Sequence, residues 1–194
     1  MMRYLIAILV VLSACPLFAQ TPLAVNLPRE QRERFYNFTR PGSCVQCSLA
    51  EIGAYQNVKP MEMLLWPSEY GPAEHHGSGP SRVSRYCRER GVAIYNVTGE
   101  PTWDYMRWAA KTGRGAAIGA GKNHMQALNG YDPKTKTWYV WNNNSPKVID
   151  VYSDAAFRRL HLASGKWCVI LDYPPSPMPP AVSAPGWNTD IRVR

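Results

Sequence analysis

The sequence predicts an α+β fold in which an N-terminal helical part packs on an antiparallel β-sheet. Two observations predict it. Apolar residues recur at helical spacing early in the chain, at 44–56, whereas short extended segments come later, at 115–120, 124–131 and 138–141. A Lys- and Thr-rich turn at 132–136 joins the last two segments as a hairpin. Helices first and an antiparallel sheet afterwards are typical of this fold class.

The remaining elements follow from capping residues and local composition. Thr102 and Ser153 are expected helix N-caps, because their hydroxyl groups can accept hydrogen bonds from free backbone N–H groups. Gly91 and Gly113 stand where two helices are expected to end. The further expected elements are helices at 28–34, 60–66, 81–90, 102–111 and 153–162, strands at 92–95 and 167–171, and a loop at 71–80.

Residues 1–19 are expected to form a secretory signal peptide. A basic Arg3 precedes an apolar run that ends in small residues, and the run is too short for a membrane-spanning helix of roughly 20 apolar residues. A second interpretation is a bacterial lipoprotein signal that ends before Cys15, which would then carry a lipid anchor. We therefore expect an exported protein that is periplasmic, extracellular or anchored to a membrane as a lipoprotein.

Three regions are expected beyond the signal. They are an N-terminal extension at 20–41, one domain at 42–172 and a Pro-rich, extended tail at 173–194 without a core of its own. The formal net charge of +8 is spread thinly, which indicates solvated helix faces. Nucleic-acid binding is not expected, because no recognisable module combines a basic stripe with stacking aromatics.

Four cysteines follow the signal, at 44, 47, 87 and 168. An even number in an oxidising compartment ordinarily indicates two disulfides, and the alternative is one disulfide and one working thiol. A structural zinc site would need a second closely spaced pair, which Cys87 and Cys168 do not form. We therefore expect no metal and no other cofactor.

The candidate chemistry lies at a helix start and at two later polar positions. Cys44 and Cys47 begin the helix expected at 44–56, where a helix N-terminus and an imidazolium can lower the pKa of a thiol. His124 begins a strand, and an Asn run at 142–144 follows the next strand. A Cys, a distant His and then an Asn follow the order of a cysteine-peptidase triad. The alternatives are bridged cysteines, a core histidine and a plain Asn-rich turn.

These residues resemble the papain-like cysteine peptidase superfamily. Its Gly-Ser-Cys-x-x-Cys start matches 42–47, and its Gly-Tyr pair on the histidine strand matches Gly130 and Tyr131. The chain looks nearest to the peptidase C39-like group, the peptidases of bacteriocin-processing exporters. Their Cys-Gly-Pro-Ala-Ser-Leu-Ala helix is similar to Cys-Val-Gln-Cys-Ser-Leu-Ala at 44–50. The resemblance extends over 44–171 and implies a papain-like fold with a Cys-His-Asn triad.

The resemblance leaves two nucleophiles open. The papain pattern implies that Cys47 attacks, whereas the exporter pattern implies that Cys44 attacks. At about 100° per residue, Cys44 borders the apolar helix face and Cys47 points nearly opposite it, which favours Cys44. In the papain-type pairing, Cys87 bridges to the cysteine of this pair that does not attack. The resemblance therefore implies Cys47 and Cys87 as disulfide candidates.

The same resemblance implies roles for His124 and one asparagine. His124 is expected to act first as base and then as acid, and papain spacing favours Asn143 as the amide that orients it, with Asn142 as the alternative. We expect an exported thiol-dependent acyl hydrolase, a cysteine peptidase with a peptide or protein substrate. The alternatives are a catalytically inert papain-like domain that binds a peptide or a cell-envelope component, and a transferase that uses the same acyl-enzyme.

One part of the family pattern is missing. Both relatives place a Gln six residues before the nucleophile as an oxyanion donor, and here Phe38 and Pro41 stand at those positions. Loss of one such donor typically lowers the rate by about 10²–10³. Asn37 and Gln46 are the remaining oxyanion candidates.

Overall fold

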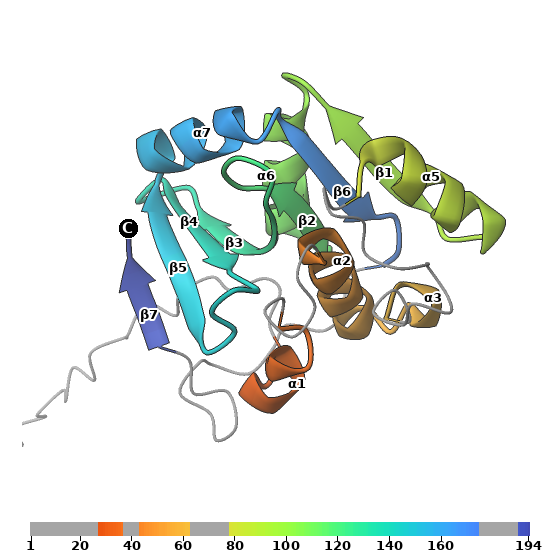
Figure 1. The fold of residues 1–194 in the computed structure, drawn as a ribbon. Coiled ribbons are helices and arrows are strands. Elements are labelled where there is room, and N and C mark those ends of the chain that lie inside the picture. Colours follow the sequence, from red (N-terminus) through yellow and green to blue (C-terminus); the bar gives the residue numbers. More distant parts are fainter. Residues whose placement is uncertain (1–26, 37–42, 63–77, 175–189) are drawn as a thin grey trace, which may run out of the picture.

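The computed structural model describes residues 27–36, 43–62, 78–174 and 190–194 (Figure 1). The predicted signal peptide, the lipid-anchor candidate Cys15 and the oxyanion candidate Asn37 lie outside these residues. Most of the predicted loop at 71–80 and most of the Pro-rich tail lie outside them as well.

Seven strands form one sheet in the order β1-β6-β2-β3-β4-β5-β7. Neighbouring strands are antiparallel except β5 and β7, which run parallel. The strands are β1 Ile94–Thr98, β2 Ala116–Gly119, β3 Met125–Asp132, β4 Thr137–Trp141, β5 Val148–Ser153, β6 Trp167–Leu171 and β7 Asp190–Val193. The fold is therefore a mixed α+β fold, as the sequence predicts.

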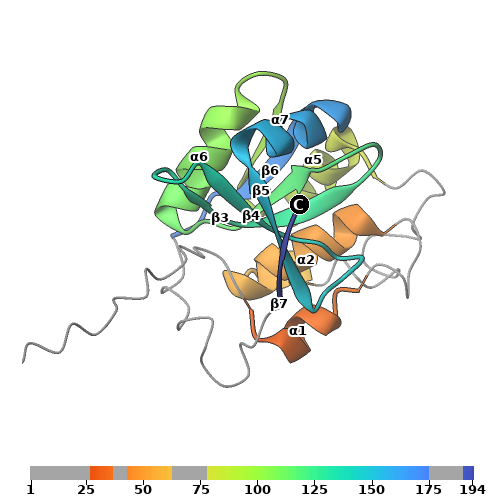
Figure 2. The same ribbon diagram turned by 90° about the vertical axis from the view of Figure 1, so that its left-hand side faces the viewer.

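Helices lie on both sides of this sheet. The helices are α1 Arg29–Glu33, α2 Cys44–Tyr55, α3 Lys59–Glu62, α5 Pro80–Glu89, α6 Thr102–Thr112 and α7 Asp154–Ala163. Figure 2 shows α6 and α7 on one side of the sheet and α1 and α2 on the other. Ala117 of β2 belongs to the hydrophobic core around α2, whereas Ala116 and Ile118 belong to the core around α6 and α7. Successive residues of β2 thus enter opposite cores, as the alternation of side chains along a strand requires.

Helix α2 is the most enclosed of the described helices. Every residue from Cys44 to Gly53 is buried, so the prediction of a single buried face for this helix is wrong. A Cβ atom at Gly53 would lie 2.5 Å from Cβ of Met61 in α3, and one at Gly115 would lie 2.7 Å from Cβ of Ile52. The two glycines therefore let α3 and the start of β2 approach α2 closely.

Most predicted helices and strands form close to their expected bounds. Ser153 caps α7, because its Oγ accepts a hydrogen bond from the Ala156 N–H, and Gly113 ends α6 at a φ of +70°. Thr102 is not the N-cap of α6: that position belongs to Pro101, and the Thr102 hydroxyl donates to the Gly99 carbonyl instead.

Three strands differ from the prediction. Strand β1 begins at Ile94, two residues later than expected, and β5 and β7 were not predicted at all. Strand β7 forms within the predicted tail at 173–194 and extends the sheet beside β5. Strand β6 forms at its expected bounds and lies inside the sheet between β1 and β2.

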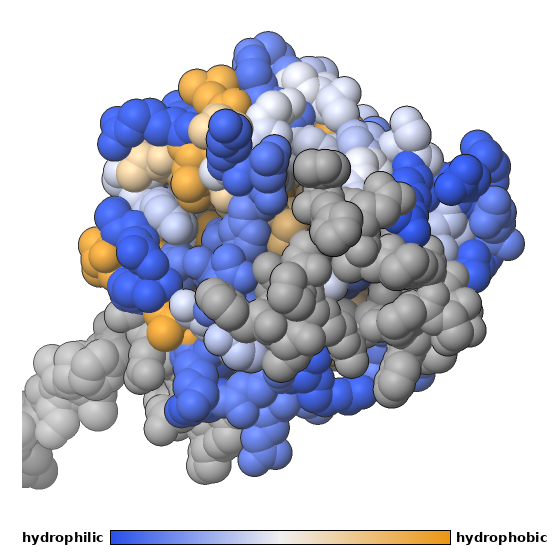
Figure 3. All heavy atoms as spheres, in the orientation of Figure 1, coloured by the Kyte–Doolittle hydropathy of each residue, from blue (hydrophilic) through white to orange (hydrophobic). Residues whose placement is uncertain are grey.

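The visible surface carries few apolar groups. Figure 3 shows that hydrophobic residues on this face form small separate groups among hydrophilic ones. Leu162 and Val193 are the large hydrophobic residues that are exposed in the described part of the chain. Across that same part, no helix has both the length and the apolar character needed to cross a bilayer.

Candidate functional site

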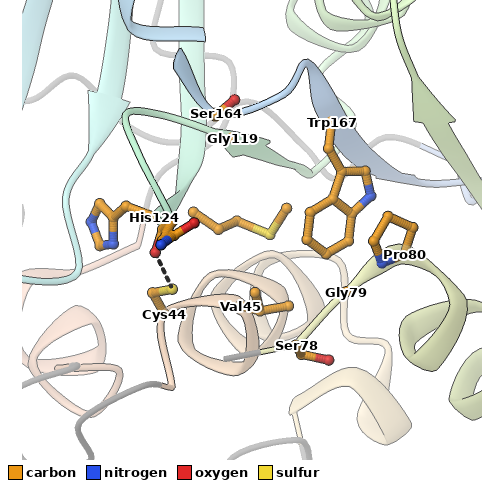
Figure 4. A pocket seen from close by; sticks show the side chains of 11 residues that line it. Cys44, Val45, Ser78, Gly79, Pro80, Gly119, His124, Ser164 and Trp167 are labelled. Atoms are coloured by element: carbon orange, nitrogen blue, oxygen red, sulfur yellow. Dashed lines mark hydrogen bonds between the residues drawn. The ribbon is translucent and has the colours of Figure 1, made fainter. Parts of the chain in front are cut away.

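A cavity of about 170 Å³ opens where the start of α2 faces the start of β3. Cys44 and His124, both singled out in the sequence, line this cavity. Figure 4 shows them at the same end, with Pro80 and Trp167 at the opposite end. The other lining residues are Val45, Ser78, Gly79, Gly119, Asn123, Met125 and Ser164. The cavity thus brings together residues from α2, the β2–β3 connection, the start of α5 and the start of β6.

Cys44 is the first residue of α2 and is 6% exposed. Its thiol donates a hydrogen bond to the backbone carbonyl of Asn123 over 3.9 Å (Figure 4). Burial raises the pKa of this thiol, although the backbone N–H groups of Met125, Val45 and Cys44 itself oppose the shift. The side chain is therefore a neutral thiol at pH 7.

The short connection between β2 and β3 determines where His124 lies. Asn123 adopts a left-handed conformation with a φ of +56°, which Asn tolerates better than most residues. The Ala120 N–H donates to the His124 carbonyl over 3.0 Å and closes the turn. The tight turn presents the Asn123 carbonyl to the thiol and places His124 beside the same cavity.

The imidazole of His124 is half-buried and contacts Asn142 at the end of β4. Its Nε2 lies 3.4 Å from Oδ1 of Asn142. Since an amide oxygen only accepts, Nε2 carries the proton and Nδ1 keeps a free lone pair. Burial lowers the pKa of His124, and the hydrogen bond to Asn142 opposes the shift. The ring is therefore neutral at pH 7.

The thiol and the imidazole share the cavity without forming an ion pair. The hydrogen bond described for Cys44 goes to Asn123, and the one described for His124 goes to Asn142. The sequence predicted a thiolate stabilised by the helix N-terminus and a protonated His124. Burial shifts the pKa values of both groups toward their neutral forms, which is the opposite direction from that prediction.

The two candidate asparagines lie in different places. Asn142, the alternative in the sequence, contacts His124. Asn143, which papain spacing favoured, is fully buried, and its Nδ2 lies 3.0 Å from each of three acceptors. These acceptors are the Cys44 carbonyl, the Ser48 hydroxyl and the Met125 carbonyl. Asn143 therefore joins α2 to β3 and does not orient the imidazole.

The predicted disulfide between Cys47 and Cys87 does not form. All four cysteines in the described residues are free and buried. Cys47 is 0% exposed within the core around α2 and does not line the cavity. Cys87 lies in the same core with its sulfur 3.7 Å from that of Met61, and burial raises its pKa to about 11. Burial likewise raises the pKa of Cys168, in the other core, to about 12.

Of the two predicted oxyanion donors, Asn37 lies outside the described residues and Gln46 is not at the cavity. Gln46 is 3% exposed and does not line it. The backbone N–H groups at the start of α2 remain as donors close to the thiol, because the first N–H groups of a helix have no partner within it. Within the described ranges, no three His, Cys, Asp or Glu side chains converge to hold a metal ion.

From Asn142, hydrogen bonds continue to residues that the sequence did not identify as candidates. Nδ2 of Asn142 donates to the fully buried carboxylate of Asp150 over 3.2 Å. Arg192 of β7 donates to both oxygens of Asp150, over 2.6 and 3.1 Å, and Arg194 donates to one over 3.1 Å. No sequence signal connects Asp150 with residues about forty positions later, because β5 and β7 pair only in the folded chain.

Comparisons with known proteins find a distant structural likeness and no match by sequence. No protein-family model matches the chain, and no curated protein matches it. Among solved structures, it is similar to a double glycine motif protease from an AMS/PCAT transporter, crystallised in complex with the leader peptide. The identity is 21% and the TM-score is 0.49, over 68% of this chain and 84% of that chain.

Proposed function

We propose that the protein is a thiol-dependent acyl hydrolase of papain-like fold, a cysteine peptidase that acts on a peptide or protein. Cys44 is the nucleophile, His124 the base and Asn142 the residue that orients it. One observation supports this assignment above all. Cys44 and His124 line the same cavity while Asn142 holds the Nε2 side of the imidazole, so that Nδ1 is free to take a proton.

The proposed reaction has two stages. Nδ1 of His124 removes the thiol proton as Cys44 Sγ attacks the acyl carbon, and a C–S bond forms. The imidazolium returns that proton to the leaving amine as the C–N bond breaks, which leaves a thioester on Cys44. His124 then takes a proton from water, whose oxygen attacks the thioester. The acid leaves and the thiol regains its proton.

Backbone donors take the place of the missing Gln in this proposal. The N–H groups of Cys44 and Val45 lie in the first turn of α2, where the positive end of the helix dipole favours a developing negative charge. The same N–H groups, with that of Met125, already oppose the burial-induced rise in the pKa of the Cys44 thiol. They therefore lie beside the sulfur that attacks, where the oxyanion of a bound acyl group would be within their reach.

A second candidate function is peptide binding without catalysis. It is supported by the neutral thiol, whose hydrogen bond goes to the Asn123 carbonyl instead of the imidazole. A site of this kind would hold an extended peptide in the cavity and leave its bonds intact. Export of the protein, which the sequence predicts from residues 1–19, is part of either proposal.

A peptidyl electrophile of the vinyl sulfone type tests the enzyme against the binding domain. Under the proposal, it forms one covalent adduct on Cys44, which peptide mapping by mass spectrometry identifies. Cys44→Ala abolishes the adduct, His124→Ala slows its formation, and Cys168→Ala, which removes a buried thiol away from the cavity, changes neither. Saturable binding without any adduct would replace the enzyme with the binding domain.

A further inference from the structure

The side-chain amide of Asn142 is fixed at both ends. Its Oδ1 lies 3.0 Å from the Asn144 N–H and 3.4 Å from His124 Nε2, while its Nδ2 donates to Asp150 over 3.2 Å. If the amide turned over, its NH₂ group would face the Asn144 N–H, and its oxygen would face the Asp150 carboxylate. Both arrangements are repulsive. Asp150 and the Asn144 amide therefore decide which Asn142 atom meets the imidazole.

Strand β7 in turn holds Asp150. Asp150 lies directly opposite Arg192 in the parallel pairing of β5 with β7. The guanidinium of Arg192 donates from Nε to one carboxylate oxygen and from Nη2 to the other. Arg194, the residue directly after β7, adds a further hydrogen bond, and its backbone N–H donates to the Val151 carbonyl over 2.9 Å. The two arginines thus fix both the position and the charge of a buried carboxylate.

We propose that Asp150, Arg192 and Arg194 are positioning residues of the candidate active site, through which β7 fixes the orientation of Asn142 and the tautomer of His124. The inference rests on the proposed function, in which His124 must present Nδ1 as a base. Without a charged, fixed acceptor at Asp150, Asn142 can turn its NH₂ group toward Nε2. The imidazole would then hold its proton on Nδ1, the atom that has to receive the proton of Cys44.

The charge of Asp150 depends on its partners. Burial alone would raise the pKa of this carboxyl, but hydrogen bonds from Arg192, Asn142 and Arg194 outweigh burial and lower it. Without the two arginines, a carboxylate at this position would lose the hydrogen bonds that compensate for its removal from water. It would take up a proton or draw in solvent, and in either case Asn142 would lose a dependable acceptor.

The test is the tautomer of His124 in the full-length protein, read from ¹⁵N chemical shifts of the imidazole in samples labelled at histidine. The expected wild-type state carries the proton on Nε2. Asp150→Asn, which keeps size and shape but adds a donor, shifts the population toward the Nδ1-protonated form. Arg192→Ala shifts it in the same direction, and Arg192→Lys restores part of the wild-type signal because it keeps the charge.

The second measurement is the reactivity of the Cys44 thiol. The rate constant for modification of Cys44 by the vinyl sulfone is expected to fall at least about 10-fold in Asp150→Asn and Arg192→Ala, as is common when a group that orients a reactive residue is removed. Arg158→Ala is the matched control. Arg158 is partly exposed like Arg192 and Arg194 and pairs with Asp154 over 2.9 Å, but it has no link to Asn142. It should leave both readouts at wild-type values.

The outcomes separate this inference from the proposed function. A wild-type tautomer in folded Asp150→Asn and Arg192→Ala overturns the positioning role. If Asp150→Asn does not fold, the partly exposed Arg192 still decides the question through its Ala and Lys variants. If the tautomer shifts as expected while wild-type Cys44 forms no adduct, the positioning role stands and the enzyme proposal fails.

Discussion

Cys44 and Cys47 lie three residues apart on one helix but in different surroundings. Both belong to the core around α2, but Cys44 also lines the cavity, whereas Cys47 does not and is 0% exposed. The helical periodicity of the sequence already favoured Cys44, because that position borders the apolar face. The periodicity did not reveal that neighbouring elements bury Cys47 as completely as they bury the apolar residues of α2. Burial of that kind depends on contacts between distant segments, which a local pattern does not contain.

The two cysteines should therefore respond differently to substitution. Cys44→Ala is expected to abolish modification by a peptidyl electrophile and to leave the free energy of unfolding nearly unchanged. Cys47→Ala is expected to lower that free energy by about 1–2 kcal/mol, because it removes buried volume, and to leave modification intact. Urea denaturation and intact mass measure the two effects. Modification that survives in Cys44→Ala but not in Cys47→Ala would reverse the assignment.

The pH dependence follows from the directions of the two pKa shifts. Because burial lowers the pKa of His124 below its usual 6.5, the imidazole stays a free base down to mildly acidic pH. The rate of inactivation by the peptidyl electrophile should accordingly fall only below pH 6.5, as His124 takes up a proton. Iodoacetamide, which reports the thiolate, should react with a midpoint above pH 9.0 because burial raises the pKa of Cys44. Fast alkylation of Cys44 at acidic pH would contradict both shifts.

Asn142 and Asn143 are adjacent in the sequence but have different roles: Asn142 contacts His124, and Asn143 joins α2 to β3. Sequence spacing identified the Asn run but not which member faces the imidazole, since consecutive side chains at a strand end point in different directions. Asn143→Ala should lower the free energy of unfolding by about 2–4 kcal/mol, because it leaves buried acceptors on α2 and β3 without a donor. Asn142→Ala should cost less stability and slow adduct formation about 10-fold to 100-fold. Equal effects of the two variants on both measurements would argue against separate roles.

Among the elements, α2 packs closely against α3 at Gly53. Gly53→Ala would place a Cβ 2.5 Å from Met61, and relief requires α2 and α3 to move apart. We expect a loss of about 1–3 kcal/mol in the free energy of unfolding, measured by urea denaturation. Gly79→Ala is the control, because a Cβ there meets no atom within 4 Å and the backbone φ is −120°. If the two variants have equal stability, the close approach of α3 is not required.

The helices and the central strands could be predicted from the sequence because their patterns are local. Apolar spacing, the Ser153 cap and the Gly113 stop each involve a few consecutive residues. Strand β5 escaped prediction because Asp150 occupies a buried position where an apolar residue would be expected. Its charge is compensated by β7, a partner that is remote in sequence. The same long-range pairing explains why the hydrogen bonds from Asn142 to Asp150 and from Arg192 to Asp150 could not be predicted.

Two hydrophobic cores stabilise the described fold, and no disulfide bond links its described residues. The core around α2 and the core around α6 and α7 share the central sheet, and all four described cysteines remain thiols. The free energy of unfolding should therefore be the same with and without a reductant. Peptide mapping of protein alkylated under denaturing, non-reducing conditions should recover the peptides of Cys44, Cys47, Cys87 and Cys168 unlinked. A linked Cys47–Cys87 peptide would contradict this expectation.

The position of β7 in the sequence, after all the cavity residues, also affects the stage of synthesis at which the proposed site can become active. The residues that form the cavity, from Cys44 to Trp167, are synthesised before Arg192 and Arg194. A nascent chain that has folded as far as β6 holds a thiol and an imidazole but no guanidinium beside Asp150. Under the positioning role of β7, the thiol of such a chain should react at least about 10-fold more slowly than that of the finished fold. The order of synthesis would thus keep hydrolysis slow until β7 has been made and has paired with β5.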